Sequence, residues 1–142
     1  VSVAASFACT LESQDSLVDL LCLGPRAFCF TAGRGVGRTE HLLEMLAAVE
    51  PCRETSFAAL ERLVLEHLPR VSGGIAIFLS WDEPRRELAR RIKAGGGRWL
   101  VLVVVAPGGA DAIDPGSRLD QPERFLVLEA GRVGAGLASL RR

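Results

Sequence analysis

The stretch that decides the organisation of this chain is AFCFTAGRGVGRTEHLLEML, residues 27–46. A short apolar run leads into a loop with glycines at 33, 35 and 37, and leucines at helical spacing follow. A strand, a glycine loop and a helix in this order are typical of α/β domains, and also of loops that bind nucleotide phosphates. The first question is therefore whether Ala32–Thr39 binds phosphate.

A phosphate-binding loop needs backbone N–H groups, a lysine that reaches the phosphates and a hydroxyl on Mg²⁺. Thr39 offers the hydroxyl, and Asp82 with Glu83 follows an apolar run like the acidic pair of an ATPase. Arg38, however, occupies the position of the lysine, and a planar guanidinium does not replace a compact ammonium. A P-loop nucleotide hydrolase that uses Ala32–Thr39 with Asp82 and Glu83 is therefore the alternative hypothesis. The glycines also suit a plain turn, and Asp82 also suits a helix N-cap.

Hydrophobic periodicity outside this loop predicts alternating helices and strands. Helices are expected at residues 1–14, at 38–49, from a Ser56 cap to Pro69, and from Asp82 to Lys93. Strands are expected at residues 17–23, 27–31, 75–81, 99–106 and 125–129. The run at 99–106 is nearly all Val and Leu, which is typical of a parallel strand covered on both faces. The pattern predicts one α/β domain over residues 1–142.

Composition and charge argue against several classes of protein, namely those that bind nucleic acid and those that bind or span membranes. The 142 residues carry 17 Lys+Arg and 17 Asp+Glu, so the formal net charge is zero. This balance argues against a surface for nucleic acid or for anionic membranes. No apolar run reaches the roughly 20 residues of a membrane-spanning helix, and no signal peptide is recognised. We expect a cytoplasmic domain, and because the chain starts at Val1 within a helical pattern, we expect a piece of a longer protein.

The cysteines are expected to be buried thiols in a reducing compartment rather than disulfides or metal ligands. They stand at Cys9, Cys22, Cys29 and Cys52, without metal-ligand spacing to His41 or His67. Both histidines are expected to be solvated or hydrogen-bonded rather than catalytic. A tight turn at residues 24–27 would place Cys22 opposite Cys29 on neighbouring strands.

The order of elements resembles a von Willebrand factor A domain. The segments that carry the resemblance are VSVAASFACTLESQDSLVDLLCLG (1–24), the glycine loop with HLLEMLAAVEP (41–51), FAALERLVLEHLPRVSGGIAIFLSWDE (57–83) and GGGRWLVLVVVAP (95–107). They look most like a bacterial family of uncharacterised membrane-anchored proteins associated with MoxR-type AAA+ ATPases. The resemblance covers residues 1 to about 130.

The resemblance implies a Rossmann-like, three-layer sheet with helices on both faces, truncated at the N-terminus. It implies a non-enzymatic module for protein–protein interaction, with a MoxR-type AAA+ ATPase as candidate partner and membrane anchoring of the full-length protein. The family's metal site takes a D-x-S-x-S loop, which this chain lacks. Thr39 and Asp82 remain as remnant candidates for metal ligands, while Trp81 stands where an aspartate is expected. We therefore expect no tightly bound metal, no cofactor and no catalytic residue.

The resemblance also places the first strand of the complete fold between the strands at 17–23 and 75–81. Without that strand, two apolar strands have unpaired backbone edges, which is costly when they are buried. Either the two strands pair directly, or a second copy covers an edge. Zero net charge favours association, so a two-fold homodimer is expected.

Overall fold

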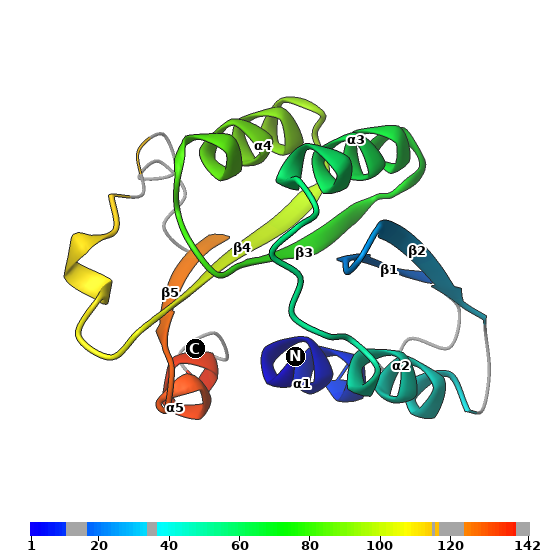
Figure 1. The fold of residues 1–142 in the computed structure, drawn as a ribbon, viewed down its shortest axis with the longest axis horizontal. Helices are drawn as coiled ribbons and strands as arrows, with labels where there is room; N and C mark the ends of the chain where they lie inside the picture. Colours follow the sequence, from blue (N-terminus) through cyan, green and yellow to red (C-terminus); the bar gives the residue numbers. More distant parts are fainter. Residues whose placement is uncertain (11–16, 34–36, 115, 117–123, 139–142) are drawn as a thin grey trace. The chain divides into compact units, whose positions relative to one another are not determined.

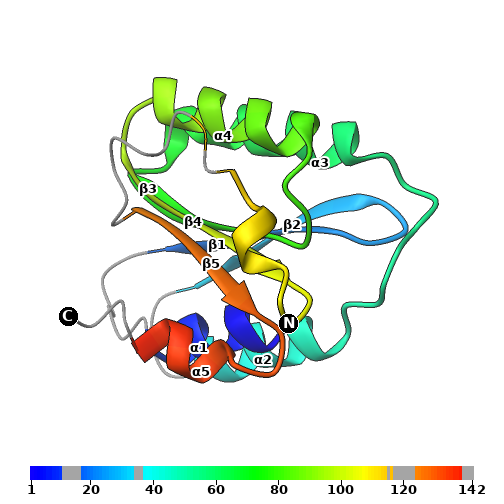
Figure 2. The ribbon, with the colours of Figure 1, turned by 90° about the vertical axis from the view of Figure 1, so that its left-hand side faces the viewer.

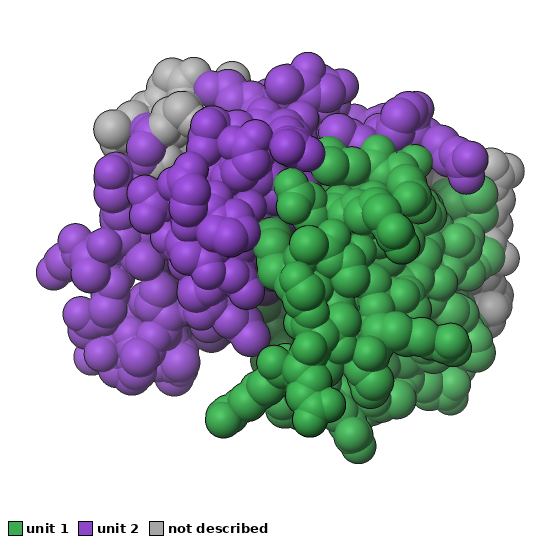
Figure 3. Space-filling view, turned by 45° about the horizontal axis from the view of Figure 1, so that its top comes forward, with its two compact units in different colours: residues 1–67 green, residues 68–142 purple. Residues whose placement is uncertain are grey.

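The computed structural model describes residues 1–10, 17–33, 37–114, 116 and 124–138. The chain divides into two compact units, Val1–His67 and Leu68–Arg142 (Figure 3). Both units are mixed α/β, so the predicted fold class is confirmed at that level. Among the described residues, no helix combines the length and the apolar character needed to cross a membrane.

Unit 1 is a β-hairpin between helices. Strands β1 (Val18–Leu23) and β2 (Ala27–Ala32) pair antiparallel. Helices α1 (Ser2–Thr10) and α2 (Arg38–Ala47) lie on one face of the hairpin, and α3 (Phe57–His67) lies on the other (Figures 1 and 2). Small and branched apolar side chains fill the first face, namely Ala8, Ala32, Leu42 and Leu46, with Val18, Leu20 and Phe30 packed against them.

The register of the hairpin differs by one residue from the prediction. Cys29 lies opposite Leu21, and Cys22 lies opposite Phe28. The reason is the connection, which places three residues (24–26) between the paired ends Leu23 and Ala27. Because successive side chains in a strand point to opposite faces, the two thiols lie on opposite sides of the hairpin.

The four cysteines are free thiols, but they are less buried than expected. Cys9 is exposed, and Cys22, Cys29 and Cys52 are half-buried. The prediction of buried thiols is therefore wrong for Cys9, which lies on the helix face opposite the buried Val3 and Ala8. Burial nevertheless raises the pKa of both Cys22 and Cys29.

Unit 2 is a parallel sheet with a helix on each face. Its strands β3 (Gly73–Phe78), β4 (Arg98–Val105) and β5 (Phe125–Glu129) are hydrogen-bonded in that order, all parallel. Helix α4 (Glu83–Ala94) covers one face, and α5 (Val133–Ala138) covers the other (Figure 2). Two short 3₁₀ helices, Leu68–Arg70 and Ala110–Ala112, complete the unit.

The centre of unit 2 is the middle of β4. Val101, Leu102 and Val103 are each 0% exposed. Consecutive strand residues face opposite sides, so this triple burial confirms that the strand is covered on both faces, as the Val- and Leu-rich run predicts. Leu88 and Ile92 of α4 and Leu128 of β5, each 1% exposed, pack this core.

Two glycines allow β3 to approach β4 closely. A Cβ atom on Gly73 would lie 2.2 Å from the carbonyl oxygen of Arg98, and one on Gly74 would lie 2.6 Å from the ring of Trp99. Neither position has room for a side chain, so the paired glycines of the sequence serve the strand contact as well as the preceding turn.

Several element boundaries differ from the prediction. The strand expected to reach Trp81 ends at Phe78, and the helix expected to reach Val49 ends at Ala47. Helix α5 was not predicted, because its sequence VGAGLA contains two weak helix formers. Tertiary contact explains Gly136, where a Cβ atom would lie 2.4 Å from Leu128 Cδ2.

The strands of the described residues form two sheets rather than one. The pairing orders are β1–β2 and β3–β4–β5, and β1 does not pair with β3. Direct pairing of the two strands, the first of the two expected outcomes, is therefore not found in the part of the chain that the structure describes.

Candidate functional site

The candidate site follows the carboxyl end of β3, because ligands of open parallel sheets bind beyond the carboxyl ends of strands. Asp82 lies here, directly before α4, with extended backbone geometry (φ −87°, ψ 176°). Its Oδ1 accepts a hydrogen bond from the backbone N–H of Arg85 (3.3 Å), and its Oδ2 pairs with the Arg85 guanidinium (2.5 Å). The N-cap role predicted for Asp82 is confirmed.

Both oxygens of Asp82 are thus engaged within the first turn of α4. Partial burial acts to raise the pKa of this carboxyl, but the hydrogen bonds and charge of Arg85 outweigh it, so the pKa lies below its ordinary value. The group is ionised at neutral pH and is already neutralised by a neighbouring cation. A metal ion at this position would have to displace Arg85.

Trp81 is buried although it lies outside the strand. Its ring contacts Phe125 (5.0 Å between centroids) and Phe78 (6.0 Å), and 8% of the residue is exposed. Its indole Nε1 donates to the carbonyl oxygen of Asp114 at 2.7 Å. The strand expected to include Trp81 has already ended at Phe78, and the side-chain contacts of Trp81 hold the turn instead.

Sequence reasoning missed the partner of Trp81. The bond joins residues 33 positions apart in the chain, and no local pattern marks Asp114. The only available signal is general, namely that a buried indole N–H requires an acceptor.

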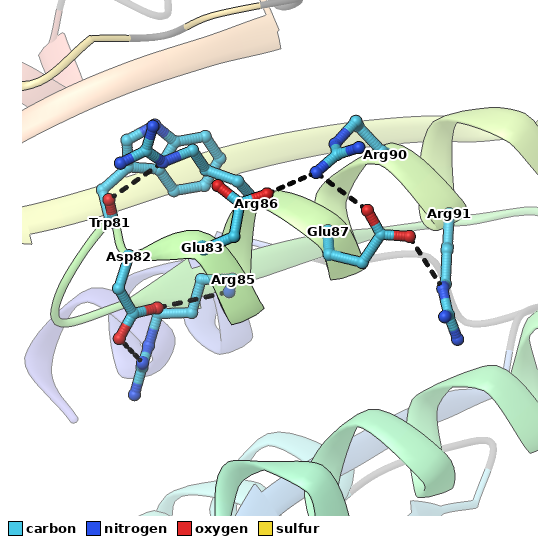
Figure 4. Close-up of polar contacts among 8 residues, drawn as sticks. All are labelled: Trp81, Asp82, Glu83, Arg85, Arg86, Glu87, Arg90 and Arg91. Atoms are coloured by element: carbon cyan, nitrogen blue, oxygen red, sulfur yellow. Dashed lines mark hydrogen bonds and ion pairs between the residues drawn. The ribbon is translucent and has the colours of Figure 1, made fainter.

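The exposed side of α4 carries alternating ion pairs (Figure 4). Arg90 contacts Glu83 (2.6 Å) and Glu87 (2.9 Å), and Glu87 also pairs with Arg91 (3.1 Å). Glu87 and Arg91 stand four residues apart, so their side chains meet on the same helix face. The arginines of this face are thus largely neutralised by its own carboxylates. Arg86 turns the other way, and its Nε donates to the carbonyl oxygen of Trp81 (3.3 Å).

The glycine loop precedes α2 in unit 1. Gly37 has a left-handed conformation (φ 89°) and is the N-cap of α2, without a side-chain cap. Arg38 begins the helix and Thr39 is its second residue; residues 34–36 of the proposed phosphate loop lie outside the described residues. Thr39 belongs to unit 1 and Asp82 to unit 2.

Other chemically active side chains are engaged in local contacts. Over the described ranges, no cluster of three or more His, Cys, Asp or Glu residues is arranged to hold a metal ion. His67 Nδ1 lies 2.8 Å from the carbonyl oxygen of Leu63, and His41 Nδ1 lies 3.3 Å from Glu44. Both histidines thus have local partners, as expected.

A second region of interest lies at the hairpin turn of unit 1. A hollow of about 470 Å³ is lined by Pro25, Arg26, Phe28 and Met45. The hydroxyl of Thr55 donates to the carbonyl oxygen of Pro25 (2.8 Å) and lies 3.1 Å from Cys52 Sγ. Hydrogen bonds from Thr55 lower the pKa of the Cys52 thiol.

Comparison of the chain with models of known protein families, with curated proteins and with solved structures returned no match.

Proposed function

We propose that this chain is a non-enzymatic protein–protein interaction module of von Willebrand factor A type. The main support for the proposal is that contacts within the chain hold the turn after β3. Asp82 is held by Arg85 as a helix cap, and Trp81 is packed and hydrogen-bonded. The position that would bind a ligand in the complete fold is thus occupied by the chain's own contacts, which leaves an exposed charged helix face for recognition.

The pairing of the strands supports the finer fold assignment. In the complete von Willebrand factor A sheet, the first strand lies between the strands that correspond to β1 and β3. Among the described residues, β1 pairs only with β2, and β3 pairs only with β4, so each of these same two strands is the terminal strand of its sheet. The parallel order and the helices on both faces of β4 agree with such a sheet.

The recognition surface we propose is the exposed side of α4, with Glu83, Glu87, Arg90 and Arg91. Arg90 and Arg91 keep about half of their side-chain surface exposed (52% and 51%). Exposed pairs of this kind contribute little to stability. They do present both charges to a partner, and charge complementarity mainly gives specificity and rapid association. A MoxR-type AAA+ ATPase is the candidate partner.

Binding of a purified MoxR-type ATPase to the immobilised chain tests the proposal. We expect Arg90→Glu combined with Arg91→Glu to weaken binding at least about tenfold, because like charges then face the partner's acidic groups. The matched control is Arg62→Glu on α3, where Arg62 is also exposed and pairs with Glu66 at 3.8 Å. Absence of binding, or equal loss in both variants, contradicts the proposed surface.

The alternative nucleotide hydrolase is tested in the same preparation. ATP with Mg²⁺ is expected to leave the melting temperature unchanged, whereas a ligand at 100 times its Kd stabilises by about 2.7 kcal/mol. A rise in melting temperature that Arg38→Ala abolishes supports the hydrolase and overturns the interaction module.

A further inference from the structure

The hollow at the hairpin turn of unit 1 has no part in the function proposed above. Its volume of about 470 Å³ falls in the range of roughly 300–1,000 Å³ that is common for small-molecule sites. The residues that line it all belong to unit 1, namely Pro25, Arg26, Phe28 and Met45. The question is which kind of ligand these side chains fit.

The walls of the hollow come from the hairpin and from α2. Phe28 lies two residues before Phe30, so the two side chains point to the same face of β2. This is the face that packs on the buried leucines of α2. Met45 belongs to α2 and, like Phe28, is half-buried. The hollow therefore lies on the α2 side of the hairpin, and α3 lies on the other side.

Two hydrogen bonds hold the turn that forms one side of the hollow. The N–H of Gly24 donates to the carbonyl oxygen of Arg26 (3.1 Å). The hydroxyl of Thr55 donates to the carbonyl oxygen of Pro25 (2.8 Å), which ties the turn to the segment between α2 and α3. Because the turn is fixed at both positions, a ligand pays less of the entropy cost of ordering the site.

The lining side chains suit two different chemical groups. The Phe28 ring, the Met45 thioether and the Pro25 ring are apolar, so they favour a ligand with an apolar body. Of the four lining residues only Arg26 is charged, and it is exposed. In the part of the chain that the structure describes, Arg26 takes part in no ion pair. A guanidinium binds a carboxylate through two parallel N–H···O bonds.

We propose that this hollow binds a carboxylate with an apolar body, which contacts Phe28 and Met45 while the carboxylate pairs with Arg26. One guanidinium balances one carboxylate, whereas a phosphate monoester carries about 1.5 to 2 negative charges and is typically bound by several cations. The carboxylate can belong to a free organic acid or to the C-terminus of a peptide. The site lies in unit 1 and does not depend on the partner proposed for α4.

NMR titration of the full chain tests the inference. Met45 is the only methionine of the 142 residues, so labelling methionine methyl groups with ¹³C gives one signal of the chain at the site. Titration with 3-phenylpropionate is expected to shift this signal and to reach saturation. 3-Phenylpropionamide keeps the ring without the charge, and acetate keeps the charge without the ring. Each should bind at least about tenfold more weakly, because each lacks one of the two contacts.

Two variants separate the Arg26 contact from general effects of charge. Arg26→Gln removes the charge at an exposed turn position. It should bind 3-phenylpropionate about tenfold more weakly than the wild type, and it should no longer distinguish this acid from its amide. The matched control is Arg62→Gln, because Arg62 is an exposed arginine of the same unit (82% of its side chain) on α3. This control should bind as the wild type does, and circular dichroism establishes that both variants are folded.

The outcomes of this experiment are distinct. An unchanged Met45 signal, equal affinity for the acid and its amide, or equal losses in the two variants overturns the proposal. A short peptide that ends in phenylalanine identifies the source of the carboxylate. Binding at least as tight as that of 3-phenylpropionate, lost when the peptide is amidated, supports the site and assigns its ligand to the end of a protein chain. A peptide that does not bind, beside an acid that does, supports the site and assigns its ligand to free organic acids.

Discussion

Asp82 shows how a residue with several plausible roles is assigned by its immediate neighbours. From sequence it suits an acidic ATPase residue, a metal ligand or a helix cap. The hydrogen bond from the Arg85 N–H and the contact with the Arg85 guanidinium favour the third role. Both oxygens of the Asp82 carboxylate therefore contact the chain's own helix α4.

The cap predicts a difference between two substitutions of Asp82. Asp82→Ala is expected to lower the free energy of unfolding by about 1 kcal/mol, because the first turn of α4 loses its acceptor. Asp82→Asn keeps an acceptor and is expected to stay within about 0.5 kcal/mol, since the lost ion pair is partly exposed. Urea unfolding measures both; equal losses would show that the charge and not the cap matters.

The same pair of variants predicts a pH dependence. The folded pKa of Asp82 lies below its unfolded value, so its contribution to stability is present above about pH 4 and is lost as the pH falls through the folded pKa. Asp82→Asn lacks this group. The difference in stability between wild type and Asp82→Asn should therefore shrink on acidification below about pH 4, and a difference that grows there would contradict the assignment.

Cys52 is the second residue whose neighbours define its chemistry. Hydrogen bonds from Thr55 lower its pKa, whereas burial raises the pKa of Cys22 and Cys29. Alkylation by iodoacetamide near neutral pH should modify Cys52 before those two thiols, because the thiolate is the nucleophile. Thr55→Val is expected to slow the reaction of Cys52 and to shift its pH profile upward. Mass spectrometry of each cysteine peptide over time measures the order; an unchanged rate in Thr55→Val contradicts it.

At the scale of elements, β3 and β4 show which strand bounds the hydrophobic pattern of the sequence predicts and which it does not. The Val- and Leu-rich run predicted β4 correctly as a strand covered on both faces, and β5 was predicted with its bounds. The end of β3 was not predictable, because the apolar Leu79 and Trp81 follow after the strand has ended. Trp81 is buried outside the strand, because its ring packs on Phe78 and Phe125.

The glycines of β3 give an element-scale prediction. Gly73→Ala is expected to destabilise by about 1–3 kcal/mol, because the added methyl group would overlap the backbone carbonyl of Arg98 and push the strands apart. The matched control is Gly134→Ala in α5, where no atom lies within 4 Å of the added Cβ. There alanine favours the helix by roughly 0.5–1 kcal/mol. Thermal unfolding of both variants should show opposite signs; a neutral Gly73→Ala would mean that the strands separate freely.

At the scale of the whole molecule, burial is unevenly distributed between the units. The centre of β4 is inaccessible to solvent, whereas none of the residues of α3 or β1 is fully buried. Amide exchange should therefore be slowest at Val101–Val103 and faster by orders of magnitude in β1 and α3, since local opening costs less where few apolar contacts must be broken. Hydrogen exchange with mass spectrometry measures this order. Equal protection in both regions would contradict it.

The sequence by itself determined the α/β class, the order of the elements and most of their positions, because hydrophobic periodicity, glycine turns and helix caps are local properties. It also predicted the cap at Asp82, since this contact joins residues within one helical turn. Only the tertiary structure decided the hairpin register, the Trp81–Asp114 bond and the separation of the strands into two sheets. These features depend on contacts between distant residues, where a single added residue in a turn reverses a strand's faces, and no local pattern records which distant groups meet.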